Sequence, residues 1–405
     1  MSDQDHAHDR FRDRTPLAEA RRQLRERIEP HGRTETVPLE SAIGRVVATR
    51  IDSPANVPSY RRAAVDGYAV RAEDTFGASD RSPVVMREAD DELAGRQAKQ
   101  VHTGSQVPEA ADAVVMVEDT EKVGGEIELF DSVSEGENVA PVGKDVRTGQ
   151  KLYEPGARLR PSDLGLLKSV GIGAVTVYDR PTVSVIPTGE ELVQSDPGPG
   201  EIIETNGLSV STLAESWGAD PTYHDIVTDD ESALAEAITD GLSTDIVVTT
   251  GGSSVGARDL VADVVAELGE VVAHGVGIKP GQPVAIGVVE GTPVLVLPGY
   301  PVSCLVNAVQ FLRPAIAWAT GRAPEPFPTV TARLDEKIYS EPGIRSFARV
   351  QLDERDGGQV ASSVRTSGAG VLSSVALSDG WIVVPEEREG LDAGATVDVQ
   401  LWEEA

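Results

Sequence analysis

Hydrophobic and polar residues between 181 and 322 alternate with two different periods. Short β-branched runs predict strands near residues 183–187, 222–227, 245–249 and 293–297. Apolar residues at helical spacing predict helices near residues 207–217, 230–240, 258–268 and 302–319. Such alternation is typical of a doubly wound, mostly parallel sheet, whose ligands bind beyond the carboxyl ends of the strands. We therefore predict an α/β domain over 181–322 with a binding site at that edge of its sheet.

The pattern before residue 181 predicts helices of a different domain. Thr15 and Pro16 read as an N-cap and a first helical position, and are followed by an apolar face of Leu17, Ala20, Leu24 and Ile28. Residues 37–50 repeat this scheme more weakly, and a capped helix is predicted near 159–167. We expect residues 15–52 and 141–180 to form one N-terminal helical and linker domain, preceded by a disordered polar tail at 1–14.

Two further regions show the alternation of β-strands. Residues 53–140 carry short β-like runs separated by polar turns, which predicts a small, mostly β domain. A proline-rich linker at 323–328 leads into residues 329–405, whose runs at 329–334, 345–352, 380–385 and 396–402 predict a small β-barrel or sandwich. The whole chain is therefore expected to be a multidomain α/β protein.

The net charge of the chain limits the kinds of molecule that it is expected to bind. The formal net charge is −30 and the pI is near 4.5. This charge repels nucleic-acid backbones and anionic membranes, so neither is expected as a partner, and any phosphate site must be local. Lysine is scarce while Arg, Asp and Glu are plentiful. That bias predicts a surface adapted to high salt, and with it a halophilic archaeal source.

The number of cysteines and the apolar stretches of the chain indicate its cellular location. Cys304 is the single cysteine, so no internal disulfide or cysteine-cluster zinc site is expected. Residues 1–14 lack the apolar segment of a signal peptide, and the apolar stretch 301–319 is interrupted by Asn307, Gln310 and Arg313. A cytoplasmic protein is predicted.

Residues 245–259 combine a strand, a glycine loop and a helix. Gly251, Gly252, Ser253 and Ser254 follow a β-branched run and precede apolar residues at helical spacing. Such a turn directs backbone N–H groups and a helix N-terminus at one place, which favours an anion and above all a phosphate. The same residues are also ordinary turn formers, so the loop alone leaves both interpretations open.

Charged residues near the predicted strand ends could complete a phosphate site. Four carboxylates there could hold a divalent cation that bridges phosphates: Glu191, Asp229, Asp230 and Asp259. Helix capping explains Asp229 and Asp230 nearly as well. Lys279 lies between two turns and could supply a point charge for an anion, or could be a solvated surface lysine. Pro298 and Pro301 make rigid a turn at a helix start, which would preorganise another anion site.

Seven motifs together resemble one family. In order they are Ala64–Val70 (AVDGYAV), His102–Gly104 (HTG), Gly143–Asp145 (GKD), Pro187–Leu192 (PTGEEL), Thr250–Gly256 (TGGSSVG), Lys279–Gly281 (KPG) and Leu297–Ser303 (LPGYPVS). The set is similar to that of molybdopterin molybdenumtransferases, the group of MoeA and the gephyrin E domain. Each motif is weak alone, but seven in order are specific.

The resemblance implies a four-part homodimer with its cleft assembled between subunits. It would take adenylylated molybdopterin and molybdate as substrates, insert the metal and release AMP with help from Mg²⁺. Expected partners are a molybdopterin adenylyltransferase and molybdoenzymes. The carried-over catalytic positions are Asp66, Thr103, Asp145, Glu191, Asp229, Asp259 and Lys279. The cofactor-binding positions are Gly251, Gly252, Ser253, Ser254, Pro298, Gly299 and Pro301. Glu191 and Asp259 are the implied metal ligands.

The sequence departs from the family at three positions. Gly275 stands where relatives often have a second basic residue, Gln282 replaces a common lysine, and Tyr300 stands where Asn is more usual. These changes place more of the anion affinity on Lys279 and on backbone donors. Two alternatives remain open: a molybdopterin adenylyltransferase, which the additional domains argue against, and a scaffold that keeps the cofactor fold but binds protein partners.

Overall fold

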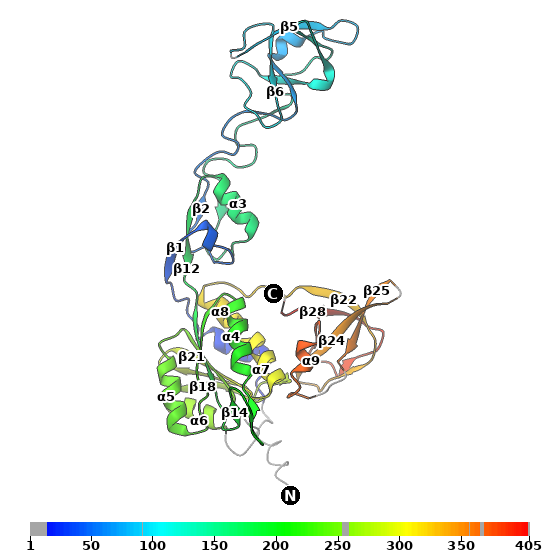
Figure 1. Cartoon of the computed structure of the whole chain (residues 1–405). Helices are drawn as coiled ribbons and strands as arrows, with labels where there is room; N and C mark the ends of the chain where they lie inside the picture. Colours follow the sequence, from blue (N-terminus) through cyan, green and yellow to red (C-terminus); the bar gives the residue numbers. More distant parts are fainter. Residues whose placement is uncertain (1–13, 91, 253–258, 356, 365–367, 404–405) are drawn as a thin grey trace. The chain divides into compact units, whose positions relative to one another are not determined.

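The structure, a computed structural model, describes residues 14–90, 92–252, 259–355, 357–364 and 368–403. The predicted tail at 1–14 therefore lies outside the described residues apart from Arg14, as do Ser253 and Ser254. Contacts between Cα atoms divide the chain into two units, one made of the residues up to Arg33 and from Tyr178 onward, and the other of Thr34–Val177. Each unit is described by itself (Figure 1).

The first unit contains a six-stranded sheet with helices on both faces. Its strands run in the order β16 (Asp220–Tyr223), β13 (Thr182–Pro187), β17 (Ile246–Thr250), β21 (Thr292–Leu297), β20 (Ala285–Val289) and β18 (Glu270–His274). The first four strands are parallel, and β20 is antiparallel to both of its neighbours. The mostly parallel, doubly wound sheet is thus confirmed, with an antiparallel pair at one edge that periodicity alone did not predict.

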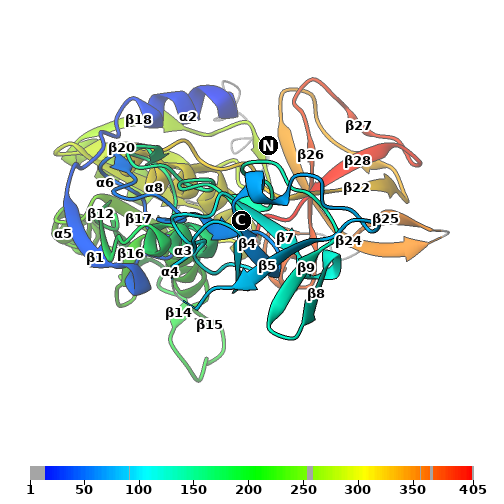
Figure 2. The same cartoon turned by 90° about the horizontal axis from the view of Figure 1, so that it is seen from above.

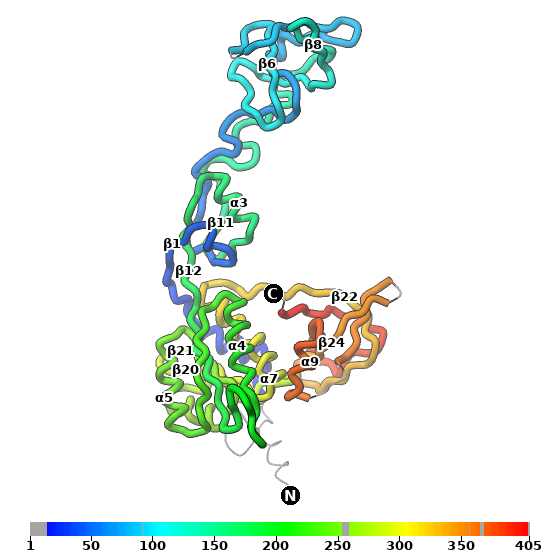
Figure 3. The backbone as a smooth tube through the Cα atoms, in the orientation of Figure 1, coloured from blue at the N-terminus to red at the C-terminus, as the bar shows by residue number. Residues whose placement is uncertain are grey.

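Alternate residues of the central strands face two separate cores. Ile246 and Val248 of β17 pack in the core that contains α2 (Leu17–Arg25), α4 (Asn206–Ser216) and α7 (Pro301–Asn307). Val247 faces the opposite core, which is formed with α5 (Glu231–Gly241) and α6 (Leu260–Leu268). Figure 3 shows α4 and α7 next to each other, and the two helices are in contact. Burial on both faces explains the continuous apolar runs of these strands.

The longest apolar helical stretch is part of this core. Residues Pro301–Ala319 are long and apolar enough to cross a membrane, but 89% of the window is buried inside the protein. The stretch consists of α7, a π-helical segment at Ala308–Leu312 and α8 (Arg313–Ala319). Proline lacks an N–H and clashes with the carbonyl four residues earlier, so Pro314 accounts for the widened turn just before it.

The C-terminal region is a closed five-stranded barrel. The strands β24 (Arg345–Arg355), β25 (Gly358–Ser363), β22 (Thr329–Leu334), β28 (Thr396–Gln400) and β26 (Gly380–Val384) pair in that order, and β26 pairs again with β24 (Figure 2). Trp381 is fully buried and stacks on Trp402 with ring centroids 4.9 Å apart. The predicted barrel is confirmed, with β25 as an additional strand. A short strand, β19 (Ile278–Lys279), joins it by pairing with Arg345 and Ser346.

The second unit contains a separate six-stranded sheet. Its order is β7 (Ala113–Met116), β4 (Gly67–Val70), β6 (Gln97–Val101), β5 (Val84–Glu88), β9 (Glu126–Leu129) and β8 (Thr120–Val123). The other elements of this part of the chain include β1 (Thr34–Pro38), β12 (Ala174–Tyr178) and the predicted helix, observed as α3 (Pro161–Ser169).

Two predictions for the N-terminal helices are wrong. The first helix starts at Leu17 with Pro16 as its cap residue, because Thr15 instead forms a bridge with Val276. No helix spans 37–50: β1 and a single 3₁₀ turn at Leu39–Ser41 stand there. Pro38 disfavours helix at the residue before it, and Val46 and Val47 bridge to Arg158 and Val177. Tertiary pairing thus overrides a weak local periodicity.

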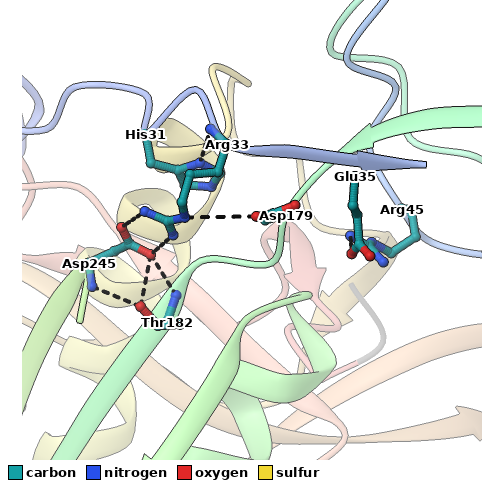
Figure 4. A network of polar contacts seen from close by, with 7 residues as sticks. All are labelled: His31, Arg33, Glu35, Arg45, Asp179, Thr182 and Asp245. Carbon is teal, nitrogen blue, oxygen red and sulfur yellow. Dashed lines mark hydrogen bonds and ion pairs between the residues drawn. The ribbon is translucent and has the colours of Figure 1, made fainter. Parts of the chain in front are cut away.

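The boundary of the first unit is fixed by a cluster of polar contacts (Figure 4). Arg33 donates two hydrogen bonds to the Asp245 carboxylate at 2.6 and 2.9 Å and lies 3.9 Å from Asp179. Asp245 also accepts from the backbone and the hydroxyl of Thr182. The chain leaves this unit at Arg33 and re-enters it at Tyr178, and Asp245 joins Arg33 to Thr182 of the re-entering segment at the base of the sheet.

Candidate active site at the carboxyl ends of the strands

Three segments that the sequence singled out separately meet at one edge of the sheet. They follow the neighbouring parallel strands β13, β17 and β21. A Cβ atom on Gly251 would lie 2.1 Å from the Thr188 carbonyl oxygen, and one on Gly299 would lie 3.6 Å from the Gly251 Cα. The Gly251 N–H donates to the Leu297 carbonyl at 3.1 Å. The strand ends therefore pack closely together, and we call the group Thr188, Gly251, Gly252 and Gly299 the cradle.

The cradle requires glycine at positions 251 and 252. Gly251 lies against Thr188, as described above, and Gly252 has a φ of +67°. A Cβ on Gly252 would approach the Val261 Cγ2 atom to 2.2 Å. Larger residues would thus both strain the backbone and collide with α6. Ser253 and Ser254 lie outside the described residues, and their cofactor-binding role stays a prediction.

Two carboxylates lie near one another beside the cradle. Burial raises the pKa of Asp229, and the negative charge of Glu191 raises it further, whereas a hydrogen bond from the Glu190 backbone opposes both effects. Asp230, and not Asp229, caps α5 by accepting from the Ala233 N–H at 2.9 Å. The capping alternative therefore applies to Asp230 alone. Asp229 and Glu191 form an acidic pair whose repulsion an added cation would relieve.

Asp259 is buried at the start of α6. It is 5% exposed, and its carboxylate faces the Ala262 N–H at 3.4 Å and the His274 Nε2 atom at 2.9 Å. His274 is the last residue of β18, an element that the sequence did not predict. Within the described part of the chain, no three His, Cys, Asp or Glu residues are arranged to hold a metal ion. The metal pair of Glu191 with Asp259 stays a prediction.

Lys279 is exposed but paired. Its Nζ atom lies 2.7 Å from a Glu341 carboxylate oxygen, and both side chains are more than half exposed. The point charge predicted for an anion is therefore shared with a residue of the C-terminal region. An anion that binds Lys279 has to compete with Glu341.

The turn before α7 is also held by the C-terminal region. Pro301 begins α7, as predicted, but the Val302 N–H donates to the Ala369 carbonyl at 3.0 Å. One first-turn donor is therefore already used, so an anion site at Pro298 and Pro301 would depend on the remaining groups. Tyr300 between them is 65% exposed.

Sequence reasoning missed two polar residues at the start of α4: Asn206, which holds this turn, and Glu204, which bonds the first turn of the helix. The Asn206 amide donates to the Gly299 carbonyl at 2.7 Å from the start of α4. Glu204 is 5% exposed and accepts from the Gly207 N–H and from the Tyr223 hydroxyl. Their only sequence signal was their position at the start of a predicted helix, which is too common to indicate a site.

In the second unit, the predicted residues Asp66 and Thr103 are hydrogen-bonded to each other. The Asp66 carboxylate accepts from the Thr103 N–H at 2.7 Å and from the Thr103 hydroxyl at 3.1 Å. These hydrogen bonds hold the pKa of Asp66 below its usual range. Asp66 and Asp145 are both exposed, and the Asp145 N–H donates to the Val57 carbonyl at 3.0 Å. An exposed, ionised carboxylate with a fixed orientation is available to a ligand.

Comparison with known proteins covers nearly the whole chain. Residues 15–171 match the MoeA N-terminal region (domains I and II), 184–318 match a probable molybdopterin-binding domain, and 331–402 match the MoeA C-terminal region (domain IV). A putative molybdopterin biosynthesis protein of Methanocaldococcus jannaschii is 36% identical, over 93% of this chain and 94% of the relative. The chain belongs to the MoeA family.

Other relatives agree with this assignment. Molybdopterin molybdenumtransferase of Haemophilus influenzae is 33% identical over 95% of this chain and 98% of its own. The crystal structure of a molybdopterin biosynthesis MoeA protein from Pyrococcus horikoshii OT3 superposes with a TM-score of 0.85 at 32% identity, covering 96% of this chain and 100% of that one. The resemblance drawn from the seven motifs is thus confirmed. The halophilic source stays a prediction.

Proposed function

We propose that this MoeA-family chain is a molybdopterin molybdenumtransferase, which inserts molybdate into adenylylated molybdopterin and releases AMP. The observation that carries the proposal is the meeting of three strand ends in one glycine-lined cradle beside the carboxylates Glu191 and Asp229. The cradle suits the phosphates of the substrate, because backbone N–H groups and a helix start favour anions. Full-length relatives bear the name of this transferase.

The chemistry of each residue suggests a different role in the reaction. Gly251 and Gly252 allow the chain to approach the phosphates closely, and Lys279 adds a point charge when it leaves Glu341. Asp66 and Thr103, which form one exposed site in the second unit, are proposed to act on the substrate in a cleft completed by a second subunit. A cytoplasmic homodimer that receives its substrate from an adenylyltransferase is the proposed working form.

Mg²⁺ is the proposed cofactor. Glu191 and Asp229 fit it, because two carboxylates together with substrate phosphates are a common set of Mg²⁺ ligands. Burial and the nearby charge of Glu191 both raise the pKa of Asp229, and a bound cation would offset both effects. When bound, the ion would supply positive charge that stabilises the negative charge of the substrate phosphates. Asp259 is proposed to contribute from the start of α6.

The test is AMP release by the purified protein from adenylylated molybdopterin. We expect release to require both molybdate and Mg²⁺, and to be lost in Asp229→Asn. An adenylyltransferase would instead consume ATP and free molybdopterin and release pyrophosphate. A scaffold would bind the nucleotide without turnover. Either of those results with well-folded protein would overturn the proposal.

A further inference from the structure

His274 and Asp259 make a polar contact at the start of α6. The His274 Nε2 atom is 2.9 Å from the Asp259 Oδ2 atom, and a carboxylate can only accept, so the imidazole N–H donates. The side chain of Asp259 is 6% exposed and that of His274 is 37% exposed. The carboxylate is thus shielded from water, and hydrogen bonds from the protein offset the free-energy cost of burying its charge.

The topology brings these residues together from separate elements. Since β18 and β21 are both antiparallel to β20, β18 runs in the same direction as the parallel strands. His274 therefore ends β18 at the same edge of the sheet as the glycine cradle. Asp259 is the first described residue after the gap at 253–258, and it is the N-cap residue of α6. The contact joins the edge strand to the helix that follows the cradle.

The two carboxylate oxygens have unequal support. The Asp259 Oδ1 atom faces the Ala262 N–H at 3.4 Å, which is long for a hydrogen bond, whereas Oδ2 receives the 2.9 Å bond from His274. A buried carboxylate without a donor is costly, so removing His274 would let this side chain turn toward other donors or water. Of these two contacts, the one from His274 is therefore the better placed to fix the orientation of the Asp259 carboxylate.

We propose that His274 is a positioning residue for the proposed transferase reaction: it holds the Asp259 carboxylate, and with it the first turn of α6, in the orientation that the cradle requires. This inference rests on the proposed function for its effect on turnover. It does not depend on that function for its effect on the start of α6.

The first measurement is amide hydrogen exchange at Leu260–Asp263 in the full-length protein. We expect His274→Leu and the milder His274→Asn, whose amide is too short to reach Oδ2, to speed exchange at the Ala262 amide at least tenfold. His274→Gln, whose amide can take the place of Nε2, should stay within threefold of the wild type. His224→Leu is the matched control, because His224 bonds Ser184 elsewhere in the same sheet at 2.8 Å.

A double-mutant cycle tests whether His274 acts through Asp259. In an Asp259→Ala background, which lacks the acceptor of the His274 N–H, His274→Asn should add less than a twofold change in exchange, because the contact is already lost. Equal acceleration in both backgrounds would overturn the proposal. So would wild-type exchange in both His274→Leu and His274→Asn.

The second measurement separates this inference from the proposed function. AMP release should fall about 10–100-fold in kcat for His274→Asn, the usual cost of losing an outer hydrogen-bond partner, with KM nearly constant and with recovery in His274→Gln. Equal losses in the Asn and Gln variants would overturn the positioning role. If the wild type itself releases no AMP, the proposed function fails, and the exchange data alone decide whether His274 positions Asp259.

Discussion

At the scale of single residues, the two cradle glycines are constrained by different neighbours. Gly251 faces the Thr188 backbone, and Gly252 faces the Val261 side chain at positive φ. We expect Gly252→Ala to lower the free energy of unfolding of the α/β domain by ~1–3 kcal/mol, because it adds left-handed strain and a collision with α6. Thermal unfolding checks this against Gly358→Ala, where an added Cβ meets nothing within 4 Å. Equal stability of the two variants would contradict the strain argument.

The charge of Lys279 leads to a second prediction at this scale. Lys279→Ala should weaken binding of the phosphorylated pterin by about 10-fold or more, because a hydrogen bond to a charged group contributes ~1.5–3 kcal/mol. The loss of the exposed pair with Glu341 should cost less than ~1 kcal/mol of stability. Glu341→Gln is the informative partner variant: it frees Lys279 and should tighten binding. Isothermal titration at one fixed salt concentration measures both, and unchanged affinities would exclude Lys279 from the phosphate site.

At the scale of elements, the cluster at the base of β17 predicts a pH dependence. Burial alone would raise the pKa of Asp245, but hydrogen bonds from Arg33 and Thr182 outweigh it and hold that pKa below its usual value. A lowered folded-state pKa stabilises above the unfolded value of about 3.9, and the contribution is lost as the pH falls through the folded value. We expect Arg33→Leu to cost ~1 kcal/mol at pH 7 and progressively less below about pH 4. Urea unfolding across this range checks it, and a pH-independent difference would show that Asp245 is not responsible.

At the scale of the whole molecule, the proposed homodimer predicts complementation. Asp66 lies in one unit and Asp259 in the other. If the cleft combines the second unit of one subunit with the first unit of its partner, a hybrid of Asp66→Ala and Asp259→Ala subunits retains one undamaged cleft. Mixing two inactive variants should therefore restore part of the AMP release. A monomer by light scattering, or verified hybrids without activity, would argue against the shared cleft.

Local periodicity was enough to place most elements of the α/β domain. The runs around Val183–Pro187 and Ile246–Thr250 are apolar on both faces because helices cover both sides of a parallel sheet, so their burial is visible in the sequence itself. The order of short motifs was also enough to identify the family and the cradle. The prediction for residues 37–50 was wrong because Val46 and Val47 pair with residues that are distant in the sequence, and such pairing leaves no periodic pattern in the local sequence.

The contacts that set the electrostatics of the site were decided by the tertiary structure. The pairs Asp259 with His274 and Lys279 with Glu341 join residues 15 and 62 positions apart, from elements whose spacing carries no shared pattern. The chain alone therefore determined which residue types stand at the strand ends and that glycines allow the strand ends to pack closely there. Only the packing of the edge strand β18 and of the C-terminal barrel against that edge decided which carboxylate is buried and which charge is already paired, because both depend on neighbours that sequence distance does not specify.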